Sequence, residues 1–358
     1  MPGPDADFAT PTPGAVTVVV TVLGDPRVER TIESLLRQER TPEEILVDDG
    51  GGSTRTVAEI TARWSARDPR VRHLDAPGNI PESRNLALRV ARGEFVAFLD
   101  ADEVAPAGWL RAMLEPFTDP QVGFAGGPTP ALSGTTRNIG ARFYDGFLRR
   151  FYDRVARSSP HALPMGNSIW RAAVFRQVGL LDTTLFRRAA SEDQEIARRA
   201  LGAGWKGVYV PEGTVDHDFS DLSTLRLLRK QAMYAEGGYV VWRRHGSTYE
   251  ASAGRVLPYV LLPVLALVGL VMLAIPGFAL AGTVLLTIGA GGLLVLAAAL
   301  TAVGLRADRT YPGLRFNVLE IPRRWATLLG AFRGWRHYGA SGRKAPGEGA
   351  AATGPNKP

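Results

Sequence analysis

The 358-residue sequence contains no cysteine, and this absence excludes several kinds of site. A disulfide scaffold, a thiolate zinc site, an iron–sulfur cluster and a cysteine nucleophile all require that residue. The length allows two or more units of roughly 100–200 residues each, which is enough to bury a sizeable core. Cysteine-based cross-linking and catalysis are therefore not part of this protein.

Charge is missing from one long segment, because residues 256–305 contain no Asp, Glu, Lys or Arg. A transmembrane helix needs about 20 apolar residues, so this segment has room for two helices and a turn. Ile275-Pro276-Gly277 is the expected turn, since Pro-Gly favours chain reversal. We predict transmembrane helices over 256–276 and 278–305. A buried helix pair in a soluble core is the alternative, although soluble helices rarely stay uncharged on every face.

Basic residues near the ends of the apolar segment predict its orientation in a membrane. The basic residues lie before and after the segment and none lies in its turn: Arg243, Arg244, Arg255, Arg306, Arg309 and Arg315. We therefore expect a multi-pass protein of the cell membrane whose folded domain and C-terminus are both cytoplasmic. Residues 1–14 are acidic and proline-rich without an apolar run, so they are expected to be disordered and not a signal peptide.

The net charge of +7 belongs to the C-terminal part, where ten Lys/Arg and three Asp/Glu lie from Arg306 onward. This placement argues against a nucleic-acid-binding domain. Residues 314–339 combine apolar side chains at three- and four-residue spacing with interspersed arginines. The pattern predicts an amphipathic helix on an anionic membrane surface, with packing on the folded domain as the alternative. Residues 340–358 are rich in Gly, Ala and Pro and are expected to be disordered.

Apolar runs alternate with helical patterns in the first part of the chain. Strands are predicted over 16–23, 44–47, 71–74 and 94–99, and helices over 28–38, 56–67 and 83–92. Such alternation is typical of a mainly parallel α/β sheet. Ligands of these sheets bind at the carboxyl ends of the strands, where the sequence places four carboxylates: Asp48, Asp49, Asp100 and Asp102.

The strand over 94–99 delivers Asp100 and Asp102 just beyond its end. Two hard oxygen ligands in this position suit a divalent cation that also binds substrate phosphates. An Asp-x-Asp pair can equally well do no more than solvate a turn. The segments around it therefore decide between the two interpretations.

Seven segments, in order between residues 44 and 217, resemble the motifs of family 2 glycosyltransferases with the GT-A fold. They are Glu44–Ser53, Asn79–Leu88, Gly93–Asp102, Pro164–Ser168, Val178–Asp182, Ser191–Ile196 with Arg198 or Arg199, and Pro211–His217. The resemblance implies a Rossmann-like, mainly parallel GT-A domain. Residues 15–125 would form its nucleotide-sugar half and 126–222 its acceptor half, followed by basic juxtamembrane helices over 223–255.

The resemblance implies a nucleotide-sugar site on the donor side of the domain. Asp102, with Asp100 or His217, would bind Mg²⁺ or Mn²⁺ against the diphosphate. Arg84 would add a fixed cation, although it could also form a structural ion pair. Asp48 or Asp49 would accept hydrogen bonds from the base and ribose, or else cap a turn. Val22 lies in the strand end that carries a further nucleotide contact in the family, but Thr21-Val22-Leu23 departs from the family pattern there.

The resemblance also implies an acceptor side. Asp193 would be the general base that deprotonates the incoming hydroxyl, and Glu192 would orient or bind the acceptor together with Gly166 and Asn167. Glu192 and Asp193 would also suit the first turn of a helix as capping residues, a role compatible with catalysis. His217 could instead be a surface histidine beside Asp216 and Asp218.

The sequence lacks the Gln-x-x-Arg-Trp segment of processive synthases. Residues 226–231 occupy its place and have the positive charge to meet a diphosphate or a lipid phosphate, but not that signature. We therefore expect transfer of a single sugar, with inversion, from a nucleotide-diphosphate sugar. Membrane attachment favours a lipid-linked acceptor with a hydroxyl. The alternatives are a polyprenyl-phosphate glycosyl synthase, a non-catalytic membrane scaffold and a nucleotidyltransferase, although the chain has no phosphate loop after its first strand. An oligomer is possible, and the sugar and nucleotide stay open.

Overall fold

The structure, a computed structural model, describes residues 8–50, 55–152, 159–186, 190–246, 253–307 and 314–339. Its core is a seven-stranded sheet in the order β3-β2-β1-β4-β7-β6-β8. The strands are β1 (Thr12–Val22), β2 (Glu44–Asp49), β3 (Val71–Asp75), β4 (Gly93–Asp100), β6 (Val122–Gly126), β7 (Asn167–Arg171) and β8 (Lys206–Tyr209). Strand pairs β1–β2, β1–β4, β2–β3 and β6–β8 are parallel, while β7 runs antiparallel between β4 and β6. The predicted mainly parallel α/β sheet is thus confirmed.

The first strand is buried on both faces, as expected for a central parallel strand. Val16, Val18 and Val20 enter one hydrophobic cluster, and Val19 enters the cluster on the opposite face. The strand begins at Thr12, which pairs with Gly93 of β4. The expected disorder of residues 1–14 is therefore wrong for residues 12–14, because pairing along β4 orders them. Residues 1–7 and 340–358, also expected to be disordered, lie outside the described residues.

The helices of the folded domain connect and flank these strands. They are α1 (Val28–Leu36), α2 (Arg55–Ser65), α3 (Ile80–Val90), α4 (Trp109–Leu114), α5 (Ile139–Phe151), α6 (Ala172–Val178) and α7 (Glu192–Gly202). A second sheet joins β5 (Glu103–Val104) to β9 (Asp216–His217) in antiparallel pairing. This small sheet brings the segment after the Asp-x-Asp pair against His217, although more than a hundred residues separate them in the sequence.

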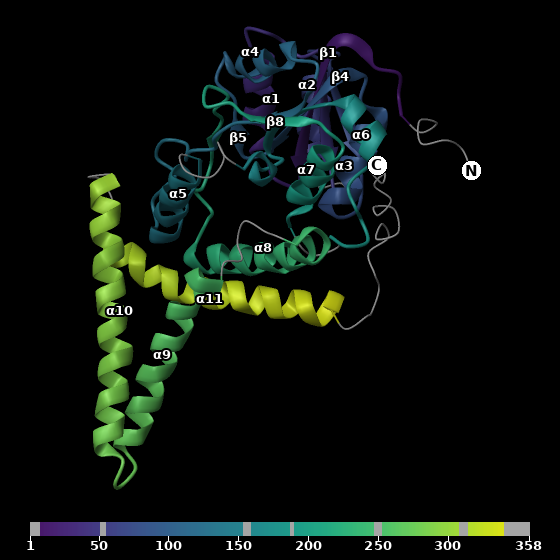
Figure 1. Cartoon of the computed structure of the whole chain (residues 1–358). Helices are drawn as coiled ribbons and strands as arrows, with labels where there is room; N and C mark the ends of the chain where they lie inside the picture. Colours follow the sequence, from purple (N-terminus) through teal and green to yellow (C-terminus); the bar gives the residue numbers. More distant parts are fainter. Residues whose placement is uncertain are drawn as a thin grey trace, which may run out of the picture.

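Outside the sheet domain the described residues form the α-helices α8 (Thr224–His245), α9 (Ala253–Leu273), α10 (Ala279–Ala307) and α11 (Leu314–Gly334). Helices α8 and α11 run side by side beneath the sheet domain, and α9 and α10 form a hairpin that extends away from it (Figure 1). A Cβ atom at Gly330 of α11 would lie 2.0 Å from the carbonyl oxygen of Ala232 of α8. The glycine therefore allows these two helices to meet backbone to backbone.

The hairpin contains the uncharged segment of the sequence. Within the described residues one helix, over Ala279–Ala302, is long and apolar enough to cross a membrane, with a mean hydropathy of 2.2. The apolar stretch Leu257–Leu273 is shorter and contains Pro258 and Pro263. Residues 274–278 join the two helices, and Gly277 adopts a positive φ of 85° there.

Candidate active site

Arg84 lies at the centre of the carboxyl edge of the sheet and joins its two sides. Its guanidinium donates to Asp100 at 3.1 Å, to Glu192 at 3.1 Å and to the Thr21 hydroxyl at 3.2 Å. Its position follows from the start of α3, where Asn79 and Glu82 form a reciprocal capping box. A rigid helix start thus holds one buried cation between the Asp-x-Asp pair and the start of α7.

The two aspartates at the end of β2 are buried, and they differ in their partners. Asp48 Oδ2 accepts a hydrogen bond from the Ser83 hydroxyl at 3.0 Å, whereas Oδ1 has no hydrogen-bond partner among the described residues. Burial raises the pKa of Asp48 to about 6, although Ser83 and Arg84 act in the opposite direction. Asp49 lies 3.6 Å from His73 Nε2. Asp48 thus presents one buried acceptor oxygen without a hydrogen bond in the described chain, and either aspartate can serve as the nucleotide ligand.

Asp102 is held by cations. Its Oδ2 atom lies 3.1 Å from His217 Nε2 and 3.7 Å from Arg27 NH2. Burial alone would raise the pKa of Asp102, but the hydrogen bond and charge of His217, with Arg27, bring it below the usual range. His217 Nδ1 lies 3.4 Å from Glu103 Oε1. The imidazole thus faces one carboxylate with each of its nitrogens.

Glu103 is a buried member of this cluster. Its second oxygen accepts the backbone N–H of Asp100 at 2.9 Å, which fixes the turn of the Asp-x-Asp segment. Burial raises the pKa of Glu103 to about 7, partly offset by His217. Burial lowers the pKa of His217, but the two carboxylates outweigh it and raise that pKa to about 10. His217 is therefore an imidazolium under these contacts.

The described part of the chain contains no group of three or more His, Asp and Glu side chains arranged to coordinate a metal ion by themselves. The side chains of Asp100 and Asp102 are 41% and 22% exposed and both present carboxylate oxygens at the site. Such a pair fits Mg²⁺ or Mn²⁺ when substrate phosphate oxygens and water complete the ligands, as Mg²⁺ prefers. His217 Nε2 and Asp102 Oδ2, 3.1 Å apart, are close enough to share one cation, so the metal contact of His217 stays a prediction.

The predicted acceptor side lies at the start of α7. Glu192 is buried and forms an ion pair with Arg84. Asp193 is partly exposed and accepts a hydrogen bond from the Gln194 N–H at 2.7 Å. Burial and the neighbouring Asp193 raise the pKa of Glu192 to about 7, although Arg84 lowers it. Burial also raises the pKa of Asp193, against backbone hydrogen bonds and Arg84. Both carboxyl groups therefore hold their protons to higher pH than ordinary Asp and Glu side chains do, and each affects the pKa of the other.

Ser191, which precedes this pair, has a left-handed backbone with φ of 94°, the one positive φ of a non-glycine residue in the described chain. Such conformations cost about 1–3 kcal/mol and persist where the surroundings enforce them. The enforcing element is α8, whose Gly237 would place a Cβ atom 1.4 Å from the carbonyl oxygen of Ala190. Helix α8 thus packs closely against the turn that positions Glu192 and Asp193.

Gly237→Ala is therefore expected to destabilise the protein by about 1–3 kcal/mol, the usual cost of overpacking, and to lower activity by moving the start of α7. The measurement is thermal unfolding of the full-length protein, together with activity. Gly202→Ala is the matched control, because a Cβ atom at Gly202 meets nothing within 4 Å. An unchanged Tm for Gly237→Ala would contradict the close packing.

Three other predicted site residues have clear positions. A Cβ atom at Gly166 would lie 2.7 Å from Asp100 Oδ2, so the Gly166 backbone packs directly against the Asp100 carboxylate. Asn167 is fully buried, and its amide is used by Trp109, Pro128 and Gly213. Both amide hydrogens and one acceptor position of Asn167 are thus used inside the fold, and its contact with the acceptor stays a prediction. The Val22 side chain packs in the core, so it offers a nucleotide only backbone or van der Waals contact.

Sequence reasoning missed Arg27 and Glu103. Arg27 hydrogen-bonds Asp25 and lies within 3.7 Å of Asp102, Asp218 and Asp221. Glu103 continues the acidic run after Asp102, and that run was the available signal. Nothing in the spacing of Arg27 pointed to its carboxylate partners, because the contacts depend on how β9 and the following loop fold back over α1.

Residues 17–179 match the sequence model of glycosyl transferase family 2. Pre-mycofactocin glycosyltransferase from Mycobacterium tuberculosis is 30% identical over 227 residues, which cover 60% of this chain and 46% of that protein. O-antigen biosynthesis protein RfbC from Myxococcus xanthus is 27% identical over 248 residues, covering 60% of this chain and 19% of that protein. The chain thus spans less than half the length of these curated relatives.

The fold is also found in a solved structure, that of mannosyltransferase PcManGT from Pyrobaculum calidifontis in complex with GDP-Man and Mn²⁺. It superposes with a TM-score of 0.57 at 19% sequence identity, covering 93% of this chain and 90% of that one. A GT-A sheet with two carboxylates at the end of β4 and two more at the start of α7 defines the glycosyltransferase class. The chain contains a region, residues 17–179, that matches glycosyl transferase family 2.

Proposed function

We propose that the protein transfers one sugar, with inversion, from a nucleotide-diphosphate sugar to a hydroxyl of a lipid-linked acceptor at the cytoplasmic face of a membrane. The observation that carries the proposal is the position of Arg84. One buried guanidinium contacts Asp100 on the donor side and Glu192 on the acceptor side, each at 3.1 Å. Donor phosphates and acceptor hydroxyl can therefore meet at a single point of the sheet edge.

The donor site supports binding of a nucleotide diphosphate. Asp48 Oδ1 is a buried acceptor without a partner in the described chain, and a base N–H or ribose hydroxyl would satisfy it. Asp100 and Asp102 would hold Mg²⁺ or Mn²⁺, which when bound neutralises charge on the diphosphate. His217 and Arg27 orient Asp102, while Glu103 fixes the backbone between the two ligands.

Asp193 is the proposed general base. It is partly exposed, so that an acceptor hydroxyl can reach it, and two backbone groups, of Gln194 and Met165, orient its carboxylate. In the transfer step the acceptor oxygen attacks the anomeric carbon, the bond from that carbon to the diphosphate oxygen breaks, and Asp193 takes the hydroxyl proton. Glu192, fixed on Arg84, keeps the acceptor facing this base.

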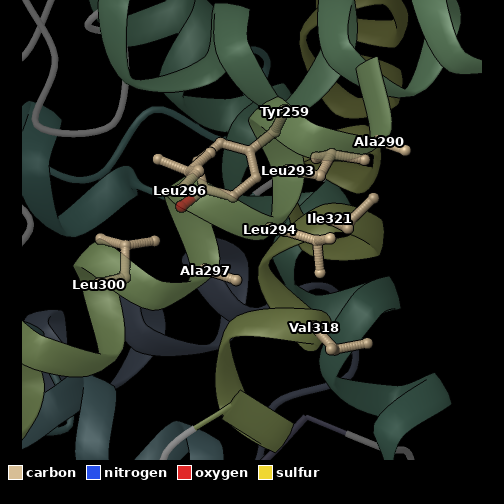
Figure 2. Close-up of a pocket in the computed structure, with 9 residues that line it drawn as sticks. All are labelled: Tyr259, Ala290, Leu293, Leu294, Leu296, Ala297, Leu300, Val318 and Ile321. Carbon is tan, nitrogen blue, oxygen red and sulfur yellow. The ribbon is translucent and has the colours of Figure 1, made fainter. Parts of the chain in front are cut away.

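A membrane-bound acceptor accounts for the apolar surface of the C-terminal helices. A single stripe of large apolar side chains, on α11 and on the residue that directly follows it, is 43% to 55% exposed: Trp325, Leu329, Phe332 and Trp335. A cavity of about 360 Å³ opens between the hairpin and α11, and its lining is almost wholly apolar (Figure 2). Tyr259, Leu293, Leu300, Val318 and Ile321 are among its lining residues. Lipid chains are suited to cover such surfaces.

The test is turnover of the full-length protein in nanodiscs with Mn²⁺. UDP-, GDP- and dTDP-sugars are screened against a lipid extract, and nucleotide release and lipid mass are measured. We expect one lipid to gain one sugar mass, and Asp102→Asn to reduce the rate at least about 100-fold by weakening cation binding.

Asp119→Asn is the matched control, since Asp119 pairs with Lys206 on the surface. A product labile to mild acid would identify a glycosyl phosphate and replace the hydroxyl acceptor by a polyprenyl phosphate. Folded protein that releases nucleotide from none of the donors would overturn the proposal.

A further inference from the structure

Lys230 of α8 presents a cation that no part of the described chain neutralises directly. No carboxylate of the described residues lies within ion-pair distance of its ammonium group, whereas Lys206 pairs with Asp119 at 2.9 Å. Its Nζ atom lies instead over two aromatic rings, 5.0 Å from the centroid of Tyr144 and 5.7 Å from that of Tyr234. Cation–π contacts of this kind hold an ammonium in place without satisfying its three donors.

The aromatic rings connect Lys230 to the Asp-x-Asp side of the site. The His217 ring lies 4.5 Å from that of Phe219, and the Phe219 ring lies 5.3 Å from that of Tyr144, measured between centroids. His217 in turn contacts Asp102. Burial lowers the pKa of Lys230, but Tyr144, Tyr234 and the carboxylates of Asp100 and Asp102 outweigh it and keep the group charged.

We propose that Lys230, held by the rings of Tyr144 and Tyr234, binds the leaving diphosphate and is a catalytic residue of the transfer. This inference rests on the proposed function. As the anomeric C–O bond breaks, its electron pair stays on the diphosphate oxygen, while the acceptor oxygen bonds to carbon and its proton passes to Asp193. The diphosphate therefore gains negative charge during the step, and a fixed cation beside it stabilises the transition state more than the ground state.

The position of Lys230 favours the diphosphate over the other phosphate source in the reaction, a lipid phosphate. The ring contacts lead from Lys230 to the cation ligands, whereas Arg323 and Arg324, nearer the apolar cavity, share Glu320. Lys230 and Tyr234 are four residues apart on α8, so they lie on one face of that helix. The same helix packs against the turn at Ser191, which precedes the proposed base Asp193. The position of Lys230 and the position of the base therefore depend on one helix.

The test uses Lys230→Met and Lys230→Arg in the full-length protein in nanodiscs, with Lys206→Met as the matched control. Binding of UDP and GDP is compared with binding of UMP and GMP in the presence of Mn²⁺. We expect Lys230→Met to weaken diphosphate binding about 10- to 100-fold, the range of a charge-assisted hydrogen bond, and to leave monophosphate binding unchanged. The variant should also lower kcat, and Lys230→Arg should restore part of both.

The outcomes separate the assignments. Diphosphate binding and kcat unchanged in Lys230→Met would overturn the proposal while wild-type turnover still supported the proposed function. A raised KM for the lipid acceptor alone would also overturn it, and would assign Lys230 to a lipid phosphate. Wild-type protein that neither binds a diphosphate nor turns over a donor would overturn both this inference and the proposed function.

Discussion

Replacement of Asp193 by asparagine is expected to reduce sugar transfer about 10²- to 10⁴-fold, the usual contribution of a general base. Asparagine preserves the size of the side chain and its position at the start of α7, but its amide does not accept the proton of the acceptor hydroxyl. Donor binding should change little, because Asp193 lies on the acceptor side of Arg84. The measurement is kcat with the preferred donor, alongside the affinity for the nucleotide.

Asp119→Asn controls for the loss of a carboxylate elsewhere, since Asp119 is exposed and paired with Lys206. Full activity of Asp193→Asn would contradict its role as base. Combined with an acid-labile product, that result would indicate an acceptor phosphate, which is already anionic and needs no deprotonation.

The pH dependence of the wild-type enzyme should report the same group. Asp193 must be ionised to accept a proton, and burial raises its pKa above the ordinary value of 3.8. Activity should therefore fall as the pH is lowered, with an acid limb above the usual Asp range. Because Glu192 has a pKa of about 7, it takes up a proton first and leaves Asp193 ionised over part of that range. An acid limb at pH 4 or below would contradict this electrostatic picture.

Most of the sheet was predictable because its strands are continuous apolar runs and its helices follow the 3.6-residue period. The run Val16–Val20 leaves no alternative to a strand buried on both faces. The exception is the start of β1, where Thr12 and Gly14 have no strand pattern. Pairing with β4 and a hydrogen bond from the Gly14 N–H to Glu94 order this segment, and such partners are distant in the sequence.

The donor carboxylates were predictable for a topological reason, since parallel strands bring their carboxyl ends to one edge. The partners of those carboxylates were not. Arg27 directly precedes α1 and belongs to no local motif. Asn167 is a second case: its motif was recognised, but nothing in the sequence indicated that its amide hydrogen-bonds Trp109 and two backbone carbonyls inside the fold. Tertiary contacts decide which hydrogen-bonding groups of a side chain stay available to a ligand. The spacing of residues along the sequence does not encode those contacts.

Replacement of Arg84 by methionine is expected to cost about 3–5 kcal/mol in stability, the usual result of removing one partner from a buried ion pair. Methionine fills a similar volume but leaves Glu192 buried without its cation. The Asp100 side chain, at 41% exposed, can recover hydration, so most of the cost falls on Glu192. Arg111→Met is the matched control, because Arg111 and its partner Glu39 are both exposed.

The pH dependence distinguishes this electrostatic role of Arg84 from simple packing. Arg84 lowers the pKa of both Glu192 and Asp193, so the variant should have both values higher and its acid limb of activity shifted to higher pH. A buried carboxyl with a raised pKa is stable when protonated and loses stability as the pH rises through that value. The loss of Tm in Arg84→Met should therefore be largest above pH 7 and shrink toward pH 5. A pH-independent loss would mean that Arg84 acts by filling space, and the link between donor and acceptor sides would have to be sought elsewhere.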